Sequence, residues 1–320
     1  MKKYMKYIKL LGSLLVVVAI FSLVKKVMAL DFNPLKNLSI KDYVLLAICC
    51  LLHCLNVLAS FFPWSQMVRV FTGKKIENRK LILVNVKSNI LKYIPGNIFQ
   101  YVGKNEIAIN EGLSHVDVAM ATLADTFIML LVSVLVGILF LQRRIVDVVR
   151  EYVNIKIIGI LFILMIIALV VLFIMIKCNN QYIKMILSKL LQGKKRVFVC
   201  LIYYFFQNIF VSLIYIAIIC IMGGKIFPPG VIISLIGASV VSWIIGFLTP
   251  GAPGGIGIRE VIMIFLTGGI INEAVIAPSV VLYRVVTIFA DILAFLIVYS
   301  ISILKRKKTK KFSKEVEMEQ

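Results

Sequence analysis

The fold of this chain is decided around the stretch Thr249-Pro250-Gly251-Ala252-Pro253-Gly254-Gly255-Ile256-Gly257-Ile258-Arg259-Glu260. Four glycines and two prolines interrupt any regular helix here, between two apolar runs. An adjacent Arg-Glu pair follows inside sequence that is otherwise apolar. Irregular backbone and charge are costly at membrane depth, and they persist where protein or a water-filled cavity surrounds them. We therefore predict that this stretch is the working site and that the rest of the chain houses it.

The composition places the chain among membrane proteins. It has 320 residues, of which 61% are hydrophobic, and a mean hydropathy of +1.00. Soluble domains have roughly 45–50% apolar residues even when glycine is included. Continuous apolar runs predict an all-α polytopic integral membrane protein with about 7–8 transmembrane helices, two segments being broken or re-entrant.

The net charge of +21 does not indicate nucleic-acid binding, because the basic residues lie between and beyond the apolar runs. That distribution is typical of cytoplasmic loops and of attraction to anionic lipid headgroups. Cys50, His53 and Cys54 share one helical face, so a soft-metal site is an alternative to ordinary packing. Packing is the favoured interpretation, and we expect no metal, no cofactor and no directly bound nucleic acid.

The apolar runs predict spans at residues 10–24, 43–62, 118–141, 157–176, 197–222, 231–248 and 274–304. The first could instead be a signal peptide, but Lys25 and Lys26 separate it from a cleavage site at Ala29, so we favour a retained span. Pro63-Trp64 is expected to end the second span. Residues 1–304 then form one transmembrane domain, and 305–320 form a basic, then acidic tail that we expect to be disordered.

Loop charge predicts the orientation. Most of the 36 Lys and Arg residues lie in segments on the same side as the N-terminus, which predicts a multi-pass cell-membrane protein with both termini cytoplasmic. Seven long spans would leave the basic tail outside, whereas the distribution of charge places it inside. Both conditions are met if residues 255–271 cross the membrane as a short broken helix. The first irregular region, 81–117, would then enter the membrane and return to the same side.

The two irregular regions resemble each other. Pro95-Gly96 is followed by Lys104 and Glu106, much as Pro250-Gly251 is followed by Arg259-Glu260. Interrupted hydrophobic segments at corresponding places in two halves indicate the binding site of a transporter. An internal repeat of 1–176 and 197–304 is therefore possible, either inverted or parallel.

Such breaks suit a phosphate group, because a helix start presents free N–H groups and a positive dipole end. The predicted helix breaks are Pro95, Gly96, Pro250, Gly251 and Pro253. The predicted headgroup-binding residues are Asn97, Gln100, Lys104, Gly254, Gly255, Gly257, Arg259 and Arg284. Glu106, Asp125, Glu260 and Asp291 are predicted to position these cations or relay protons. Arg284 and Asp291 are expected to pair across helices with Lys104, Asp125 or Arg259. The alternative for the second break is that Arg259 and Glu260 neutralise each other.

At these motifs the chain resembles a known family. Tyr93-Ile-Pro-Gly-Asn97, Gly103-Lys104, Asn110-Glu-Gly-Leu-Ser114 and Asp125 are similar to its first signature. The stretch 249–260 with Tyr283-Arg284 is similar to its second. The family is the membrane-embedded, flippase-like domain of lysylphosphatidylglycerol synthases, or multiple peptide resistance factors. The resemblance covers nearly the whole chain, although Pro95–Gln100 departs from a stretch that is often more basic in the family.

The resemblance implies binding and translocation of an anionic or aminoacylated phospholipid or a polyprenyl-phosphate lipid. In full-length members a separate soluble domain transfers lysine from lysyl-tRNA to phosphatidylglycerol, which confers resistance to antimicrobial peptides. We expect no such domain here, so lysyl transfer would need a synthase on another chain, and a glycosyltransferase is another possible partner. A lipid-binding scaffold that moves nothing is the third hypothesis.

Overall fold

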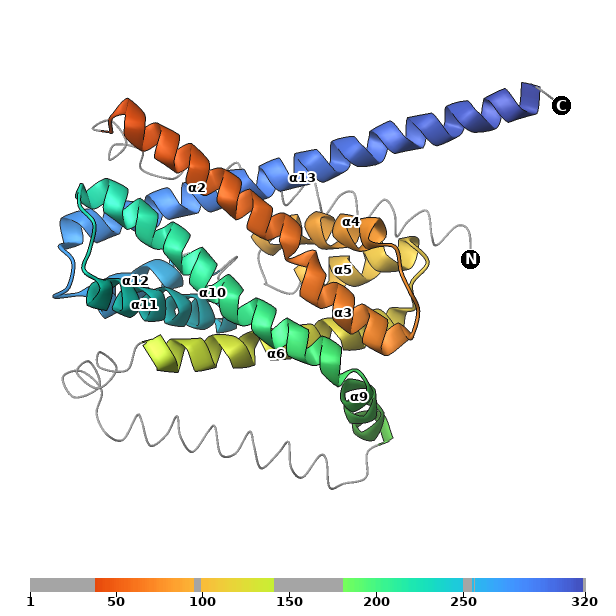
Figure 1. Ribbon diagram of the computed structural model, residues 1–320, viewed down its shortest axis with the longest axis horizontal. Coiled ribbons are helices and arrows are strands. Elements are labelled where there is room, and N and C mark those ends of the chain that lie inside the picture. Colours follow the sequence, from red (N-terminus) through yellow and green to blue (C-terminus); the bar gives the residue numbers. More distant parts are fainter. Residues whose placement is uncertain (1–37, 95–98, 141–180, 250–254, 256, 319–320) are drawn as a thin grey trace.

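The computed structural model describes residues 38–94, 99–140, 181–249, 255 and 257–318. These residues are helical apart from short connections, and they contain no strand, so the all-α prediction is confirmed for them. The predicted spans 10–24 and 157–176 lie outside the described residues. Five described helical stretches are long and apolar enough to cross a membrane: Ile40–Thr72, His115–Phe140, Lys194–Gly223, Pro229–Leu248 and Ala274–Ser302. Each coincides with a predicted span (Figure 1).

The first of these stretches consists of two helices, α2 (Ile40–Ala59) and α3 (Phe61–Thr72). A capping box at Ser39 and Asp42 starts α2 by satisfying backbone N–H groups that have no helical partner. The prediction that Pro63-Trp64 ends the span is wrong. Pro63 lies in the first turn of α3, where its missing N–H removes no helical hydrogen bond.

The next segment is helical, although the sequence predicts an irregular region over 81–117. It comprises α4 (Asn78–Asn89), the 3-10 helix η2 (Ile90–Tyr93), α5 (Phe99–Asn110) and the long α6 (His115–Phe140). Ile94 has extended backbone with ψ 134°, because a following proline disfavours helical backbone. The prediction of an irregular region is therefore wrong for α4 and α5, and a helix ends ahead of Pro95 as expected.

The remaining described elements form the second half of the chain. They are α9 (Gln181–Gln192), α10 (Lys194–Gly223), α11 (Pro229–Leu248), α12 (Ile258–Thr267) and α13 (Glu273–Met318). α11 ends at Thr249, which is extended like Ile94 and also precedes a proline. The expected disordered tail is wrong as far as Met318, since α13 continues to that residue.

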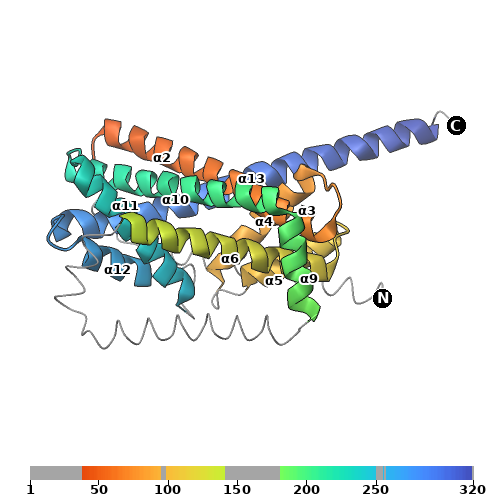
Figure 2. The same cartoon turned by 60° about the horizontal axis from the view of Figure 1, so that its bottom comes forward.

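The two segments that contain the breaks run in opposite directions. α6 packs against α11, and α13 packs against α4. Figure 1 shows α6 antiparallel to α13 and α4 antiparallel to α11, and Figure 2 shows the same long helices from another side. A helix, a Pro-Gly break, a short helix and a long helix thus occur twice with reversed polarity.

The two largest apolar clusters hold most of the helices together. One joins α3, α4, α6 and α10 around Trp64, Met67 and Leu81. The other joins α10, α11, α12 and α13 around Ile219, Leu235 and Met263. All six of these side chains are completely buried. The outward faces of the long helices carry exposed apolar side chains, for example Leu55, Phe127, Ile138, Phe206 and Phe289.

Candidate functional site

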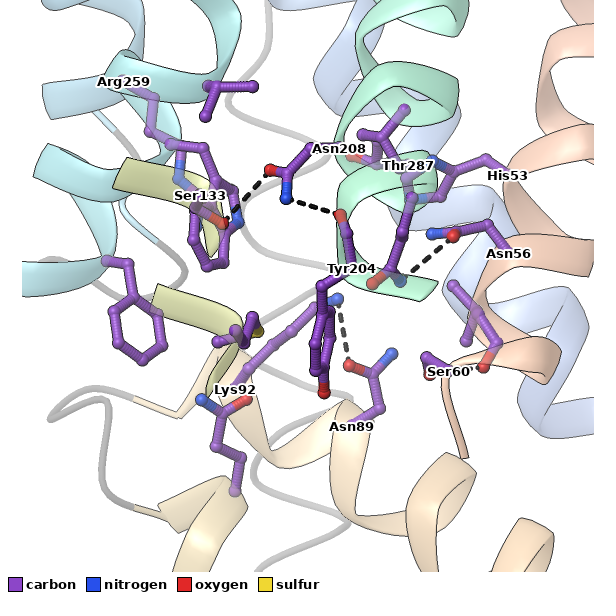
Figure 3. Close-up of a pocket in the computed structure, with 18 of the residues that line it drawn as sticks. His53, Asn56, Ser60, Asn89, Lys92, Ser133, Tyr204, Asn208, Arg259 and Thr287 are labelled. Carbon is purple, nitrogen blue, oxygen red and sulfur yellow. Dashed lines mark hydrogen bonds between the residues drawn. The ribbon is translucent and has the colours of Figure 1, made fainter. Parts of the chain in front are cut away.

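A cavity of about 330 Å³ lies inside the helical assembly. Its walls come from α2, α4, η2, α5, α6, α10, α11, α12 and α13, so both break-containing segments contribute (Figure 3). The volume is within the range of small-molecule sites in proteins. It is large enough for a lipid headgroup.

The cavity brings together most of the predicted charges that the structure describes. The predicted residues that line it are Gln100, Lys104, Asp125, Arg259, Glu260 and Arg284. The predicted residues outside the described part are Pro95, Gly96, Asn97, Pro250, Gly251, Pro253 and Gly254. Gly257 precedes α12 with φ 89°, a backbone conformation that requires glycine. The break therefore has the glycine geometry that the sequence predicts.

Glu260 pairs with Arg284 and not with its neighbour in sequence. Glu260 Oε1 accepts a hydrogen bond from Arg284 Nε, and this ion pair links α12 to α13. Arg284 Nη2 also donates to the carbonyl oxygen of Gly255 at 3.2 Å. The alternative that Arg259 and Glu260 neutralise each other is therefore wrong in this structure.

Arg259 lines the cavity and forms no ion pair with any residue that the structure describes. Its guanidinium lies over the Trp243 ring at 5.8 Å from the centroid, and its buried Nε has no hydrogen-bond partner among the described residues. Two glycines make room for the side chain: a Cβ on Gly246 would lie 2.3 Å from the Arg259 Cγ, and a Cβ on Gly255 would lie 2.6 Å from Nε. An unsatisfied buried donor is costly, so this arrangement is suited to an incoming hydrogen-bond acceptor.

Lys104 is the corresponding cation of the first break. Its Nζ lies 4.6 Å from the centroid of the Trp64 ring, and it has no ion pair among the residues that the structure describes. Burial lowers the pKa of the Lys104 amine to about 8, against the opposing effect of Asp125. Asp125 in turn accepts a hydrogen bond from the hydroxyl of Tyr204 at 2.7 Å. The two tryptophans of the chain thus each face one break cation.

Asp291, which the sequence predicts to position a cation or relay protons, contacts the segment before Pro95. It is completely buried, forms an ion pair with Lys92 at 2.7 Å and accepts hydrogen bonds from Asn89 and Tyr93. These contacts fasten η2 and the end of α4 to α13. The predicted pairing of Asp291 with Lys104, Asp125 or Arg259 is wrong, since its carboxylate is satisfied by the segment before Pro95.

Glu106 does not hold Lys104. Residues two apart on a helix point away from each other, and Glu106 does not line the cavity that Lys104 lines. The described residues hold no group of three His, Cys, Asp or Glu side chains that could bind a metal ion, and His53 instead faces the Tyr283 ring edge-on.

Apart from Gln100, the sequence interpretation missed the neutral polar residues of the cavity. Among those that line it are Asn56, Ser133, Gln207, Asn208, Ser212 and Ser239. Their signal was present, because amides in the middle of an apolar span are themselves unusual. The predicted site consists of charged residues and of residues next to the breaks, so it leaves these side chains out.

Comparison of the sequence with protein-family models finds no match, and comparison with curated proteins finds none either. The functional interpretation therefore depends on the residues and geometry described above.

Proposed function

We propose that this protein is a multi-pass membrane protein that binds the phosphate of a membrane lipid between its two breaks and moves that lipid across the bilayer. The ligand class is an anionic or aminoacylated phospholipid or a polyprenyl-phosphate lipid. The observation that carries the proposal is Arg259, a buried cation that enters a cavity with an unpartnered donor. A phosphate oxygen is the acceptor that a guanidinium binds best.

The membrane setting is supported by the five apolar helices and by their exposed apolar faces. The proposal includes the spans predicted at 10–24 and 157–176, and cytoplasmic termini. In this arrangement α5 belongs to a re-entrant segment, and α12 is the short broken crossing. Only a protein-lined or water-lined cavity makes such breaks tolerable inside a bilayer.

The reversed polarity of the two break-containing segments supports translocation over simple binding. Inverted repeats that place broken helices around a central site are a common architecture of secondary transporters. We include an inverted repeat in the proposal, with α4–α6 corresponding to α11–α13. No ATP-binding loop motif occurs in the sequence, so the proposed driving force is a gradient or the imbalance of the lipid between leaflets.

The resemblance to the flippase-like domain of lysylphosphatidylglycerol synthases supports lipid handling as well. That family has two activities, lipid translocation and lysyl transfer. The buried Arg259 and the cavity that it lines suit the binding of a lipid phosphate, which supports translocation. We therefore propose membership in the family with respect to lipid movement.

The test is a leaflet-accessibility assay in proteoliposomes. A fluorescent phosphatidylglycerol is exposed to a quencher that reaches only the outer leaflet, and the protein-dependent fraction that becomes accessible is measured over time. The parent chain should move lipid, and Arg259→Ala should reduce the rate at least tenfold, because a charge-assisted hydrogen bond contributes about 1.5–3 kcal/mol.

The matched control is Arg196→Ala, which removes an exposed guanidinium near the start of α10. Its rate should equal that of the parent. Equal rates for parent and Arg259→Ala would refute the site assignment, and lipid binding without movement would identify the protein as a scaffold.

A further inference from the structure

Part of the cavity wall is neutral and strongly polar. Three of the hydrogen-bonded pairs of uncharged side chains in this wall include a residue of α10. Gln207 donates to Asn56 of α2 at 3.1 Å. Ser133 of α6 donates to Asn208 at 3.2 Å, and Ser239 of α11 donates to Ser212 at 2.6 Å.

Gln207 and Asn56 have further hydrogen-bonding capacity. The bond between Gln207 and Asn56 uses one atom of each amide. Among the described residues, neither the Gln207 Oε1 nor the Asn56 Nδ2 takes part in another hydrogen bond. An amide has two donors and two acceptor lone pairs. The wall therefore offers both donors and acceptors, which is what a hydroxyl group requires.

Aromatic rings line the same cavity. Tyr215 stacks on Tyr283 at 4.2 Å between centroids, and Tyr204 and Trp243 lie on other walls. Such rings present apolar faces with a polar tip. Amides next to aromatic faces match a ligand that has hydroxyl groups on a carbon skeleton.

The charges of the cavity disfavour a cationic headgroup. Its lining holds the cations Lys92, Lys104, Arg259 and Arg284. Against them stand Asp125, which accepts a hydrogen bond from Tyr204, and Glu260, whose Oε1 pairs with Arg284 while its buried Oε2 has no hydrogen-bond partner among the described residues. A lysylated headgroup carries two ammonium groups, whereas the lining holds four cations and only two carboxylates. A phosphate instead needs an unpartnered cation, which Arg259 supplies.

We infer that the ligand is a phosphate-ester lipid whose remaining headgroup is a neutral polyhydroxyl group, such as glycerol, inositol or a sugar. The phosphate binds at Arg259, and the hydroxyls bind the amide wall of Asn56, Gln207 and Asn208. Figure 3 shows Arg259 on one side of the cavity and Asn56 on the other, with Asn208 between them. This inference rests on the proposed function and narrows its substrate class.

The test measures lipid binding to the full chain in nanodiscs, by native mass spectrometry, with probes of matched acyl chains. Phosphatidylglycerol and phosphatidylinositol carry the polyol, phosphatidic acid carries phosphate alone, and lysylphosphatidylglycerol carries the added cations. A polyprenyl-phosphate hexose, compared with the polyprenyl phosphate, forms a second arm that separates a lipid-linked sugar from a phospholipid source. The polyol probes should bind at least tenfold tighter than phosphatidic acid and lysylphosphatidylglycerol.

Two variants link this preference to the wall. Gln207→Leu should lose the preference for the polyol while binding phosphatidic acid like the parent, which also shows that it is folded. Gln192→Leu is the matched control, because it removes an exposed amide at the end of α9, and it should keep the preference.

The outcomes separate the two proposals. Equal binding of all phosphate lipids, or tightest binding of lysylphosphatidylglycerol, would overturn the polyol inference and leave phosphate-lipid binding intact. Absence of binding by every phosphate probe would overturn both.

Discussion

The two breaks present different cations to the same cavity. At the second break, Arg259 lies in a groove formed by two glycines, and the neighbouring Glu260 is held by Arg284 from another helix. At the first break, Lys104 lies over Trp64, and the nearby Asp125 is held by the hydroxyl of Tyr204. Both arrangements leave the cation without an ion pair among the described residues.

The two cations differ in how readily each loses its proton, and therefore its positive charge. A guanidinium stays protonated in proteins and binds phosphate with two parallel donors, whereas an ammonium is a point charge whose pKa shifts readily on burial. The comparison suggests that the second break holds the phosphate and that the first break receives or releases it. Four predictions examine this division, in order of decreasing effect.

The largest effect is expected from Gly246→Ala. The added Cβ would lie 2.3 Å from the Arg259 Cγ, so the whole side chain must leave its groove. We expect the lipid transfer rate to fall as far as in Arg259→Ala, at least tenfold. The matched control is Gly230→Ala on the same helix, where a Cβ meets no atom within 4 Å. A Gly246→Ala variant with the parent rate would show that the position of Arg259 does not matter.

The second effect concerns the ion pair that only the second break has. Glu260→Ala leaves Arg284 without its carboxylate, and breaking a largely buried pair costs up to about 3 kcal/mol. We expect a lower thermal unfolding midpoint in detergent. The exchange of both charges, Glu260→Arg with Arg284→Glu, should recover part of the loss. No recovery in the double variant would mean that the pair is not the source of the stability.

The third effect is a pH dependence at the first break. Since the pKa of Lys104 is lowered to about 8, the amine is charged below that pH and becomes neutral as the pH rises through it. Binding of phosphatidylglycerol, whose phosphodiester keeps one negative charge over this range, should therefore weaken about threefold to tenfold between pH 7 and pH 9. Lys104→Arg should remove this decline, because the guanidinium stays charged. A decline of equal size in both proteins would assign it to another group.

Apolar run length and proline positions predicted the helices of this structure with different success. Apolar length predicted the five described spans, because the thickness of a bilayer sets helix length. Proline positions predicted where α4–η2 and α11 end, because the constraint is local. The bounds of α3 and α13 were missed, since tolerance of Pro63 depends on its place in a helical turn and the tail beyond Leu304 has no apolar pattern.

The site was predicted in outline but not in its pairing. Charges within apolar sequence pointed correctly to Arg259, Lys104 and Arg284 as cavity residues. Which carboxylate joins which cation depends on the packing of helices far apart in sequence, so the partners of Glu260 and Asp291 could not be read from spacing. The neutral amides could have been found, because Gln207 and Asn208 interrupt a long apolar span.

The smallest effect is expected from Glu106→Gln. This variant tests whether the two breaks, which are similar in sequence, also use their glutamates in the same way. In sequence, Glu106 stands near Lys104 much as Glu260 stands beside Arg259. In structure, Glu260 lines the cavity and carries an ion pair, whereas Glu106 does neither. The transfer rate and the unfolding midpoint of Glu106→Gln should therefore equal those of the parent, while Glu260→Gln should lower the midpoint. If Glu106→Gln slows transfer as much as Glu260→Gln does, Glu106 must reach the cavity in another conformation of the transport cycle, and the breaks would be equivalent after all.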